Sequence, residues 1–268
     1  MAIQRRAFCI GAAGTGLALA AGPALAEDAA DYRQIVFADP KTPEMEAEFL
    51  HWYDTQHISD MFQVPGMWRI RRLVVLRAAT PSSTLPHHIA LYDFRLKPSE
   101  VEPAMAVPTK RKAAGLNPDT TTFDHDASRS IIFKASSPDL TPPTPVAAKA
   151  SPTGAPLGHY AMVVMVNPTP ASPELNDTGY DRQHVLEVLG GAGMKTARLD
   201  YLYRPLTRNY AAPTALAVWE FDSGDIDATL ADLAARRTGG AIKPVPRWAP
   251  DHVQVYYCRI DEVRLKTA

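Results

Sequence analysis

The segments Tyr53-Asp54-Thr55-Gln56-His57 and Tyr180-Asp181-Arg182-Gln183-His184 carry Tyr, Asp, Gln and His in the same order, 127 residues apart in a chain of 268. The same shift places Gly66-Met67 on Gly193-Met194, Arg71 on Arg198, and Asp124-His125 on Asp251-His252. One offset that holds over about 90 residues predicts an internal repeat, and a repeat constrains the architecture more than any single element does.

Each copy shows the same order of strand and helix patterns. In the first copy we expect strands at 34–38, 67–76, 88–95 and 128–134, and helices at 43–62 and 99–114. In the second copy we expect strands at 160–166, 192–203, 214–221 and 252–260, and helices at 173–189 and 226–237. The order β-α-β-β-α-β is that of a ferredoxin-like unit. The sequence therefore predicts an α+β chain with two tandem ferredoxin-like units, residues 32–135 and 158–262.

The segment 136–157 separates the two copies. It contains six prolines among Ser, Thr and Ala, a composition that favours an extended linker without a core of its own. A linker of this length reaches about 60 Å when extended, which is enough to cross a small domain.

The first copy resembles a known family. Trp52-Tyr53-Asp54 with His57, followed by Val64-Pro65-Gly66, is similar to the first helix and turn of the EthD-like branch of the dimeric α/β-barrel superfamily. In the second copy only Tyr180-Asp181, His184 and Gly193 keep this pattern. The resemblance implies that the two units pair as a pseudo-dimeric barrel of eight strands around a ligand cavity. It also implies lyase, isomerase, dehydratase or cyclase chemistry.

The N-terminal residues 1–26 are typical of an export signal. Arg5-Arg6 precede an apolar run rich in Ala and Gly, and Ala24-Leu25-Ala26 supplies a small-x-small cleavage pattern. We favour a twin-arginine signal and hence a periplasmic protein, with an ordinary Sec signal as the alternative. A retained membrane anchor is less favoured because the run is short and diluted with Gly.

Charge and cysteine content restrict the partners. The formal net charge of −1 gives no electrostatic footprint for nucleic acid. Of the two cysteines, Cys9 would leave with the signal, so Cys258 could not form an internal disulfide. We expect a small-molecule substrate, no nucleic acid, and no membrane contact after signal cleavage. The chain would be a monomer with an internal pseudo-dimer or a homodimer.

The candidate catalytic residues form a set that recurs in both copies. On a helix, Asp54 and His57 share one face, so the carboxylate could orient the imidazole as a general base, with Tyr53 as a proton donor. The recurrent set is Asp181, His184 and Tyr180. The alternative is an Asp-His pair that only pins a helix surface to a loop. Because the first copy keeps the fuller motif, we expect the working site there, with the second copy completing its walls.

The candidate substrate-binding residues are less specific. Arg71 and Arg198 lie in apolar strands, where each needs either an acidic partner such as Asp93 or Glu220, which would make it structural, or an anionic ligand. The other candidates are the cavity aromatic Trp52 and the histidines at the start of the last strand of each copy, His125 and His252. The Asp before each of these histidines could instead cap a turn.

No metal, nucleotide or phosphate motif is present in the sequence, and we expect neither metal nor cofactor. The leading hypothesis is an exported, cofactor-independent lyase or isomerase in which His57 abstracts a proton from a small apolar oxygenated or aromatic compound. The alternatives are a periplasmic binding protein without enzymatic activity and a haem-binding, peroxidase-like protein, since some relatives in the broader superfamily bind haem.

Overall fold

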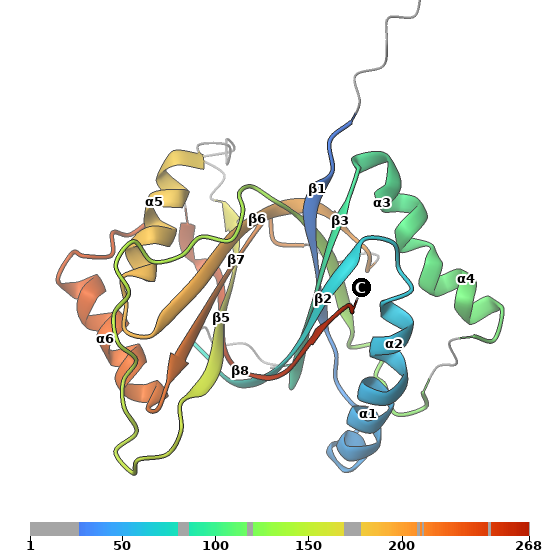
Figure 1. The fold of residues 1–268 in the computed structure, drawn as a ribbon, viewed down its shortest axis with the longest axis horizontal. Coiled ribbons are helices and arrows are strands. Elements are labelled where there is room, and N and C mark those ends of the chain that lie inside the picture. Colours follow the sequence, from blue (N-terminus) through green and yellow to red (C-terminus); the bar gives the residue numbers. More distant parts are fainter. Residues whose placement is uncertain are drawn as a thin grey trace, which may run out of the picture.

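A computed structural model describes residues 27–79, 86–116, 120–168, 178–207, 210, 212–245 and 248–267, without the side chains of residues 167, 168, 178–181 and 248–252. Its eight strands close into one antiparallel barrel in the order β1-β3-β2-β8-β5-β7-β6-β4. Helices lie outside the barrel on two opposite sides (Figure 1). The chain is therefore an α+β protein built on a closed eight-stranded barrel.

Each half of the chain supplies four neighbouring strands. The first half contributes β1 (Ala30–Phe37), β2 (Met67–Ala78), β3 (His88–Leu96) and β4 (Arg129–Ala135). The second half contributes β5 (Gly158–Pro168), β6 (Met194–Pro205), β7 (Ala215–Ser223) and β8 (Trp248–Leu265). The halves meet where β2 pairs with β8 and where β4 pairs with β6. The strand predictions agree with these bounds to within a few residues, apart from β8, which is longer at both ends.

The helices of the first half interrupt their regular geometry twice. A short 3-10 turn η1 (Pro43–Met45) leads into α1 (Glu46–Trp52), a π-helical turn η2 (Tyr53–His57) and α2 (Ile58–Met61). The region expected as one helix, 99–114, divides into α3 (Pro98–Met105) and α4 (Val107–Ala113), with Pro108 in the first turn of α4. Proline lacks the N–H that a continuous helix would need there.

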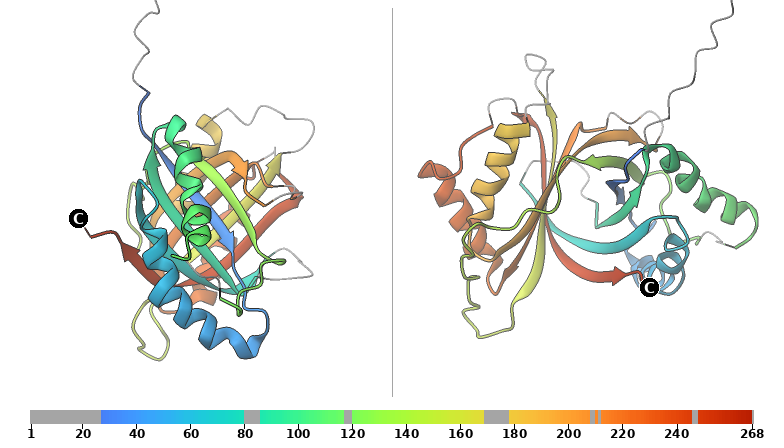
Figure 2. Two further views of the ribbon diagram at one scale, coloured as in Figure 1. Left: turned by 90° about the vertical axis from the view of Figure 1, so that its right-hand side faces the viewer. Right: turned by 45° about the horizontal axis from the view of Figure 1, so that its top comes forward.

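The second half has two regular helices, α5 (Thr178–Leu189) and α6 (Ile226–Thr238). As expected from the sequence, Asp225 begins α6, and its carboxylate accepts a hydrogen bond of 3.0 Å from the N–H of Ala228. The start of the helix expected at 173–189 lies partly outside the described residues. Figure 2 shows that α5 and α6 cover one side of the barrel and α1 to α4 the other.

The middle strands of the two halves are equivalent in position. β2 and β6 begin and end 127 residues apart, and so do β3 and β7. Each second strand follows a glycine with positive φ, Gly66 (72°) and Gly193 (73°). A Cβ at either glycine would overlap the carbonyl oxygen of the facing strand, so both turns require Gly.

The outer strands do not keep the same offset. Tyr32 on β1 and Tyr160 on β5 both face the equivalent phenylalanines of the third strands, which makes the first strands 128 residues apart. Opposite these tyrosines lie Lys134 and Arg259, so the last strands are 125 residues apart. The expected equivalence of Asp124-His125 with Asp251-His252 is therefore wrong by two residues, because the loops before β4 and β8 differ in length.

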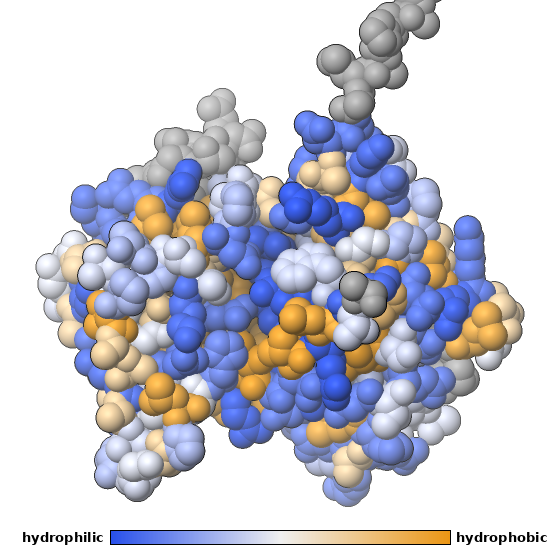
Figure 3. Space-filling view, viewed as in Figure 1, coloured by the Kyte–Doolittle hydropathy of each residue, from blue (hydrophilic) through white to orange (hydrophobic). Residues whose placement is uncertain are grey.

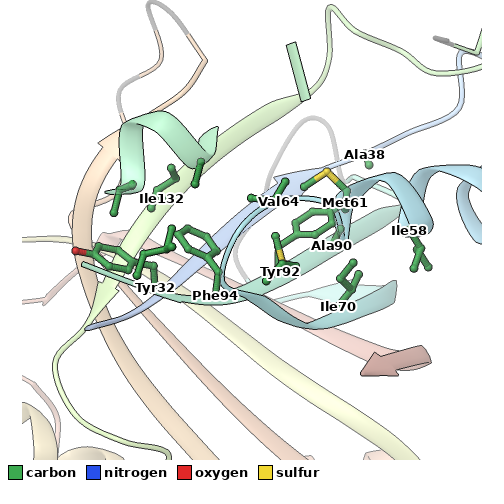
Figure 4. Packing of buried hydrophobic residues seen from close by; sticks show 14 of the residues in the cluster. Tyr32, Ala38, Ile58, Met61, Val64, Ile70, Ala90, Tyr92, Phe94 and Ile132 are labelled. Carbon is green, nitrogen blue, oxygen red and sulfur yellow. The ribbon is translucent and has the colours of Figure 1, made fainter. Parts of the chain in front are cut away.

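Three buried clusters hold the fold together. One lies inside the barrel and includes Ile35, Leu73 and Val218. Two lie outside it, each between one half's strands and helices. Figure 4 shows the first-half cluster, where Met61 and Val64 pack against Ala90 and Tyr92. Because the interior side chains are themselves buried core, the interior cluster does not match the expectation of a barrel wrapped around its ligand cavity.

The proline-rich segment 136–157 is extended, as its composition predicts, and it packs along the second half. Leu140 forms an isolated antiparallel bridge with Ala197 on β6, and the N–H of Gly193 donates to the carbonyl oxygen of Val146. The linker thus continues alongside β6 beyond the end of β4. On the face seen in Figure 3, hydrophobic residues are interspersed with hydrophilic ones. In the part of the chain that the structure describes, no helix is long and apolar enough to cross a membrane.

Candidate functional site

A cavity of about 460 Å³ lies between the outer face of the second-half strands and the helices α5 and α6. This volume is in the range of pockets that take small organic ligands. Its lining residues come from five elements and the ends of two loops: Ala79, Met162, Val164, His184, Val188, Trp219, Leu230, Leu233, Ala234, Arg237, Ile242, Pro244, Val245, Val253, Val255 and Tyr257.

The periodicity of the strands and helices explains why these residues meet. Alternate residues of β5 and β8 point outward from the barrel, which places Met162 beside Tyr257 on the cavity wall. Residues three and four apart on α6, such as Leu230, Leu233 and Arg237, share the face that turns toward the strands. The result is a mostly apolar chamber with polar groups at only a few points.

His184 is the buried polar residue of this chamber. It lies on α5, and its side chain retains 9% exposure. Its Nδ1 contacts the carbonyl oxygen of Lys243 at 2.9 Å. A carbonyl can only accept, so Nδ1 carries the hydrogen, and the lone pair of the neutral ring is on Nε2. The histidine expected from the repeat therefore lines the cavity with a defined tautomer.

Two further polar side chains reach the cavity, Arg237 from the last turn of α6 and Tyr257 from β8. Burial raises the pKa of Tyr257, while the positive charges of Arg77 and Arg237 act in the opposite direction. Trp219 contributes its ring, and its indole N–H donates to the carbonyl oxygen of Val185 at 3.3 Å. Trp219 had been recognised as a possible lining residue, but Arg237 and Tyr257 had not, because a lone Arg in a helix and a Tyr in a strand carry no motif.

The equivalent layer of the first half is filled by its own side chains. The hydroxyl groups of Tyr53 and Tyr92 are hydrogen-bonded to each other, and Nε2 of His57 lies 3.1 Å from the Tyr92 hydroxyl. Burial raises the pKa of both tyrosines. Trp52 stacks at 4.8 Å from the ring of His57. The π-helical turn brings Tyr53 and His57 to the same phenol, a distortion that often accompanies functional positions.

Asp54 has a different partner from the one we expected. Its carboxylate pairs with Arg72 at 2.6 Å, and the same guanidinium reaches Asp261 on β8 at 2.9 Å. Asp54 therefore joins the helix to the junction between β2 and β8. The hydrogen bond of the His57 ring is to Tyr92, so the proposed role of Asp54 as the residue that orients His57 loses its geometric basis.

Arg71 and Arg198 lie in a buried ion-pair network at one end of the barrel interior. Asp93 accepts from Arg33 and Arg71 at 2.7 Å each, and Arg198 approaches it at 3.3 Å. Arg71 also pairs with Glu220, and Arg198 with Asp200 at 2.7 Å. These acidic partners give both arginines a structural role, so they no longer need a substrate carboxylate.

The charges in this network support one another. Burial alone would raise the pKa of Asp93, but the surrounding guanidiniums, that of Arg33 first, hold it well below its ordinary range. Burial would also raise the pKa of Glu220, but Arg71 and His159 lower it to about 2. Asp93 comes from the first half and Glu220 from the second, so the network joins the two halves.

The remaining candidates are dispersed. His125 is exposed and packs edge-on against Phe123, with ring centroids 4.7 Å apart. Asp124 caps a turn by accepting from the N–H groups of Asp126 and Ala127, which supports the structural alternative. The side chains of Tyr180, Asp181 and His252 lie outside the described residues, as does the expected signal at 1–26.

The position of the cavity is opposite to our expectation. We expected the working site in the first half, whereas the cavity that contains a candidate histidine lies in the second. The physical reason is the bulk and pairing of Tyr53 and Tyr92, which are 3% and 1% exposed and close the first-half layer. Among the described residues no group of three or more His, Cys, Asp or Glu side chains could hold a metal ion.

Comparison with known proteins establishes the fold. No family model and no curated protein matches the sequence. An anthrone oxidase-like protein has a similar structure, with a TM-score of 0.51 and 12% identity over 88% of this chain and 93% of that one. It has a dimeric α/β-barrel fold, and this chain has the same architecture.

Two other solved structures are more distant. A protein of Fusobacterium nucleatum subsp. nucleatum ATCC 25586 described as a "Putative monooxygenase" has a TM-score of 0.46 and 10% identity, over 89% of this chain and 96% of that one. Chlorite dismutase from Candidatus Nitrospira defluvii, in complex with imidazole, has a TM-score of 0.41 and 10% identity, over 87% and 91%. At these identities the likeness concerns the fold alone.

Proposed function

We propose that this protein is an exported, cofactor-independent enzyme that abstracts a proton from a small, largely apolar oxygenated or aromatic compound bound in the second-half cavity. The observation that carries the proposal is the placement of His184 in the wall of a ligand-sized apolar chamber. An enzyme is plausible on this fold, which also occurs in proteins described as oxidase-like.

His184 has the features required of a base. Because Nδ1–H is held by the Lys243 carbonyl oxygen, Nε2 is the nitrogen that can take a proton, and the ring cannot turn without losing that bond. The apolar walls exclude water around a bound ligand, which strengthens any charge interaction during the reaction. Lyase, isomerase and dehydratase reactions all begin with such a proton removal next to a carbonyl group, and we assign the protein to this class.

Exchange of carbon-bound hydrogen in D₂O tests the proposal without knowledge of the product. We would follow the loss of the α-proton signals of 2-tetralone by nuclear magnetic resonance with the mature protein. His184→Gln should lower the rate about 100- to 10,000-fold, the range that a general base contributes. His57→Gln is the matched control and should leave the rate unchanged. If His57→Gln abolishes exchange and His184→Gln does not, the base lies in the first half instead.

Obstruction of the cavity gives an independent test. Ala234 lines the cavity on α6, whereas the neighbouring Ala235 does not. Ala234→Phe should reduce exchange about 100-fold by displacing the ligand from its reactive position, and Ala235→Phe should have little effect. Equal rates in the two variants would place the reaction outside this cavity.

Two other parts of the proposal concern origin and location. We infer that the halves are tandem ferredoxin-like units from one duplication, which the matching bounds of β2 with β6 and β3 with β7 support. We also propose export through the signal at residues 1–26, which periplasmic fractionation and the mass of the mature protein would test. A Soret band in that preparation would contradict cofactor independence, and ligand binding without exchange would indicate a carrier protein.

A further inference from the structure

The cavity carries an arrangement of charge that its general function does not require. Arg237 lines the chamber from the last turn of α6 and stands close enough to the buried Tyr257 to influence its pKa. In the described part of the chain Arg237 has no acidic side chain within ion-pair distance. The neighbouring arginines are satisfied by the protein: Arg236 donates to the carbonyl oxygen of Glu187 at 3.0 Å, and Arg77 pairs with Asp227 at 2.6 Å.

An arginine at the edge of an apolar chamber favours an anion there. A guanidinium binds a carboxylate through two parallel N–H bonds, and the adjacent apolar surface strengthens the interaction relative to water. The phenol of Tyr257 is kept in its neutral form by burial, so its O–H can donate to the same anion. Both donors therefore favour an acidic oxygen at one point of an otherwise apolar cavity.

The other walls favour a ring next to that oxygen. Trp219 and Tyr257 supply aromatic surface, and Met162 and Leu233 supply polarizable and aliphatic surface. Aromatic side chains pack well against planar ligands in offset or edge-on arrangements. We propose that the substrate is a cyclic or aromatic carboxylic acid, and that Arg237 with Tyr257 is the group that selects the acid. This inference rests on the proposed function for the words "substrate" and "site", but not for the binding preference itself.

Calorimetric titration with a matched pair of probes tests the preference. 2-Naphthoate and 2-naphthamide share the ring and differ in the charge. We expect the mature protein to bind 2-naphthoate about 10- to 100-fold more tightly, the value of a charge-assisted hydrogen-bonded pair. The preference should fall at high salt because Arg237 is exposed at the rim.

Variants identify the residue responsible. Arg237→Gln should bring the two probes to within about 3-fold of each other, by weakening 2-naphthoate and not 2-naphthamide. Arg236→Gln changes the net charge equally on the same helix and should retain the preference. Tyr257→Phe should reduce it by a smaller factor than Arg237→Gln.

The outcomes separate the inference from the proposed function. Equal binding of both probes by the unmodified protein, or an unchanged preference in Arg237→Gln, overturns the inference even if proton exchange depends on His184. An Arg237-dependent preference without any His184-dependent exchange supports the inference and rejects the enzymatic proposal. Lack of saturable binding of either probe overturns the acid-binding site.

Discussion

The two halves of the barrel have nearly superimposable middle strands but opposite helix layers. In the first half Tyr92 on β3 is hydrogen-bonded to Tyr53 from the helix, and the layer is closed. In the second half the equivalent residue of β7 is Trp219, which lines a cavity of about 460 Å³ below α5 and α6. The strand framework therefore does not decide where a site forms. The side chains between strand and helix decide it.

The barrel interior shows the same contrast for charge. Asp93 and Glu220 occupy equivalent positions on β3 and β7. Asp93 is fully buried among arginines, whereas the side chain of Glu220 retains 14% exposure and also contacts His159. Because both belong to one network, substitutions at the two positions can measure how differently the halves depend on it.

We expect the largest effect from Asp93→Asn. Removal of one charge from a fully buried pair leaves the other uncompensated and typically costs about 3–5 kcal/mol of unfolding free energy. Glu220→Gln should cost less, about 1–2 kcal/mol, because water can reach the site and solvate Arg71. Urea denaturation measures both values. Similar losses in the two variants would mean that the burial difference has no energetic weight.

The next comparison concerns the two helix layers. Tyr92→Phe removes the hydroxyl that Tyr53 and His57 share and leaves buried polar atoms unsatisfied, which should cost about 1–3 kcal/mol. Trp219→Phe enlarges an existing cavity and removes one weak indole bond, so its main effect should be weaker ligand binding. We would measure urea midpoints and 2-naphthoate affinity for both variants. If Tyr92→Phe weakens the ligand as much as Trp219→Phe does, the two layers are coupled or the ligand lies elsewhere.

Part of this description could be predicted from sequence. The repeated Tyr-Asp-x-Gln-His pattern and the two turn glycines, Gly66 and Gly193, indicated the equivalence of the halves. Strand and helix periodicity gave the elements, since each pattern depends on nearby residues only. The arginines of the apolar strands were recognised as needing acids, and Asp93 and Glu220 were named as partners.

The location of the cavity could not be predicted in this way. Motif strength favoured the first half, but the motif residue Tyr53 fills the layer there by pairing with Tyr92, which is 39 residues away. Asp54 binds Arg72, whose position depends on strand register. Arg237 has no motif, and its relation to Tyr257 depends on how α6 lies over β8. Such pairings are properties of the tertiary structure, and local sequence patterns do not encode them.

The smallest effect we expect concerns pH, at another pair of equivalent positions. Asp31 faces Arg95 between β1 and β3, and His159 faces Asp222 between β5 and β7, so the acid and the base have exchanged strands. Hydrogen bonds to Glu220 and Asp222 raise the pKa of His159, although burial opposes them. Lys195 also contacts Asp222, at 3.0 Å, but keeps its charge near neutral pH.

Since the pKa of His159 is higher in the folded than in the unfolded chain, its stabilisation is complete below the unfolded value and is lost as pH rises through the folded value. The difference in unfolding free energy between the unmodified protein and His159→Gln should therefore shrink between pH 6 and pH 8.5. At this partly exposed site it should stay below about 1 kcal/mol. Asp31→Asn is the control, because neither Asp31 nor Arg95 titrates in that interval and its effect should be constant. A pH-independent difference for His159→Gln would show that the exchanged pair responds to pH no more than its first-half equivalent does.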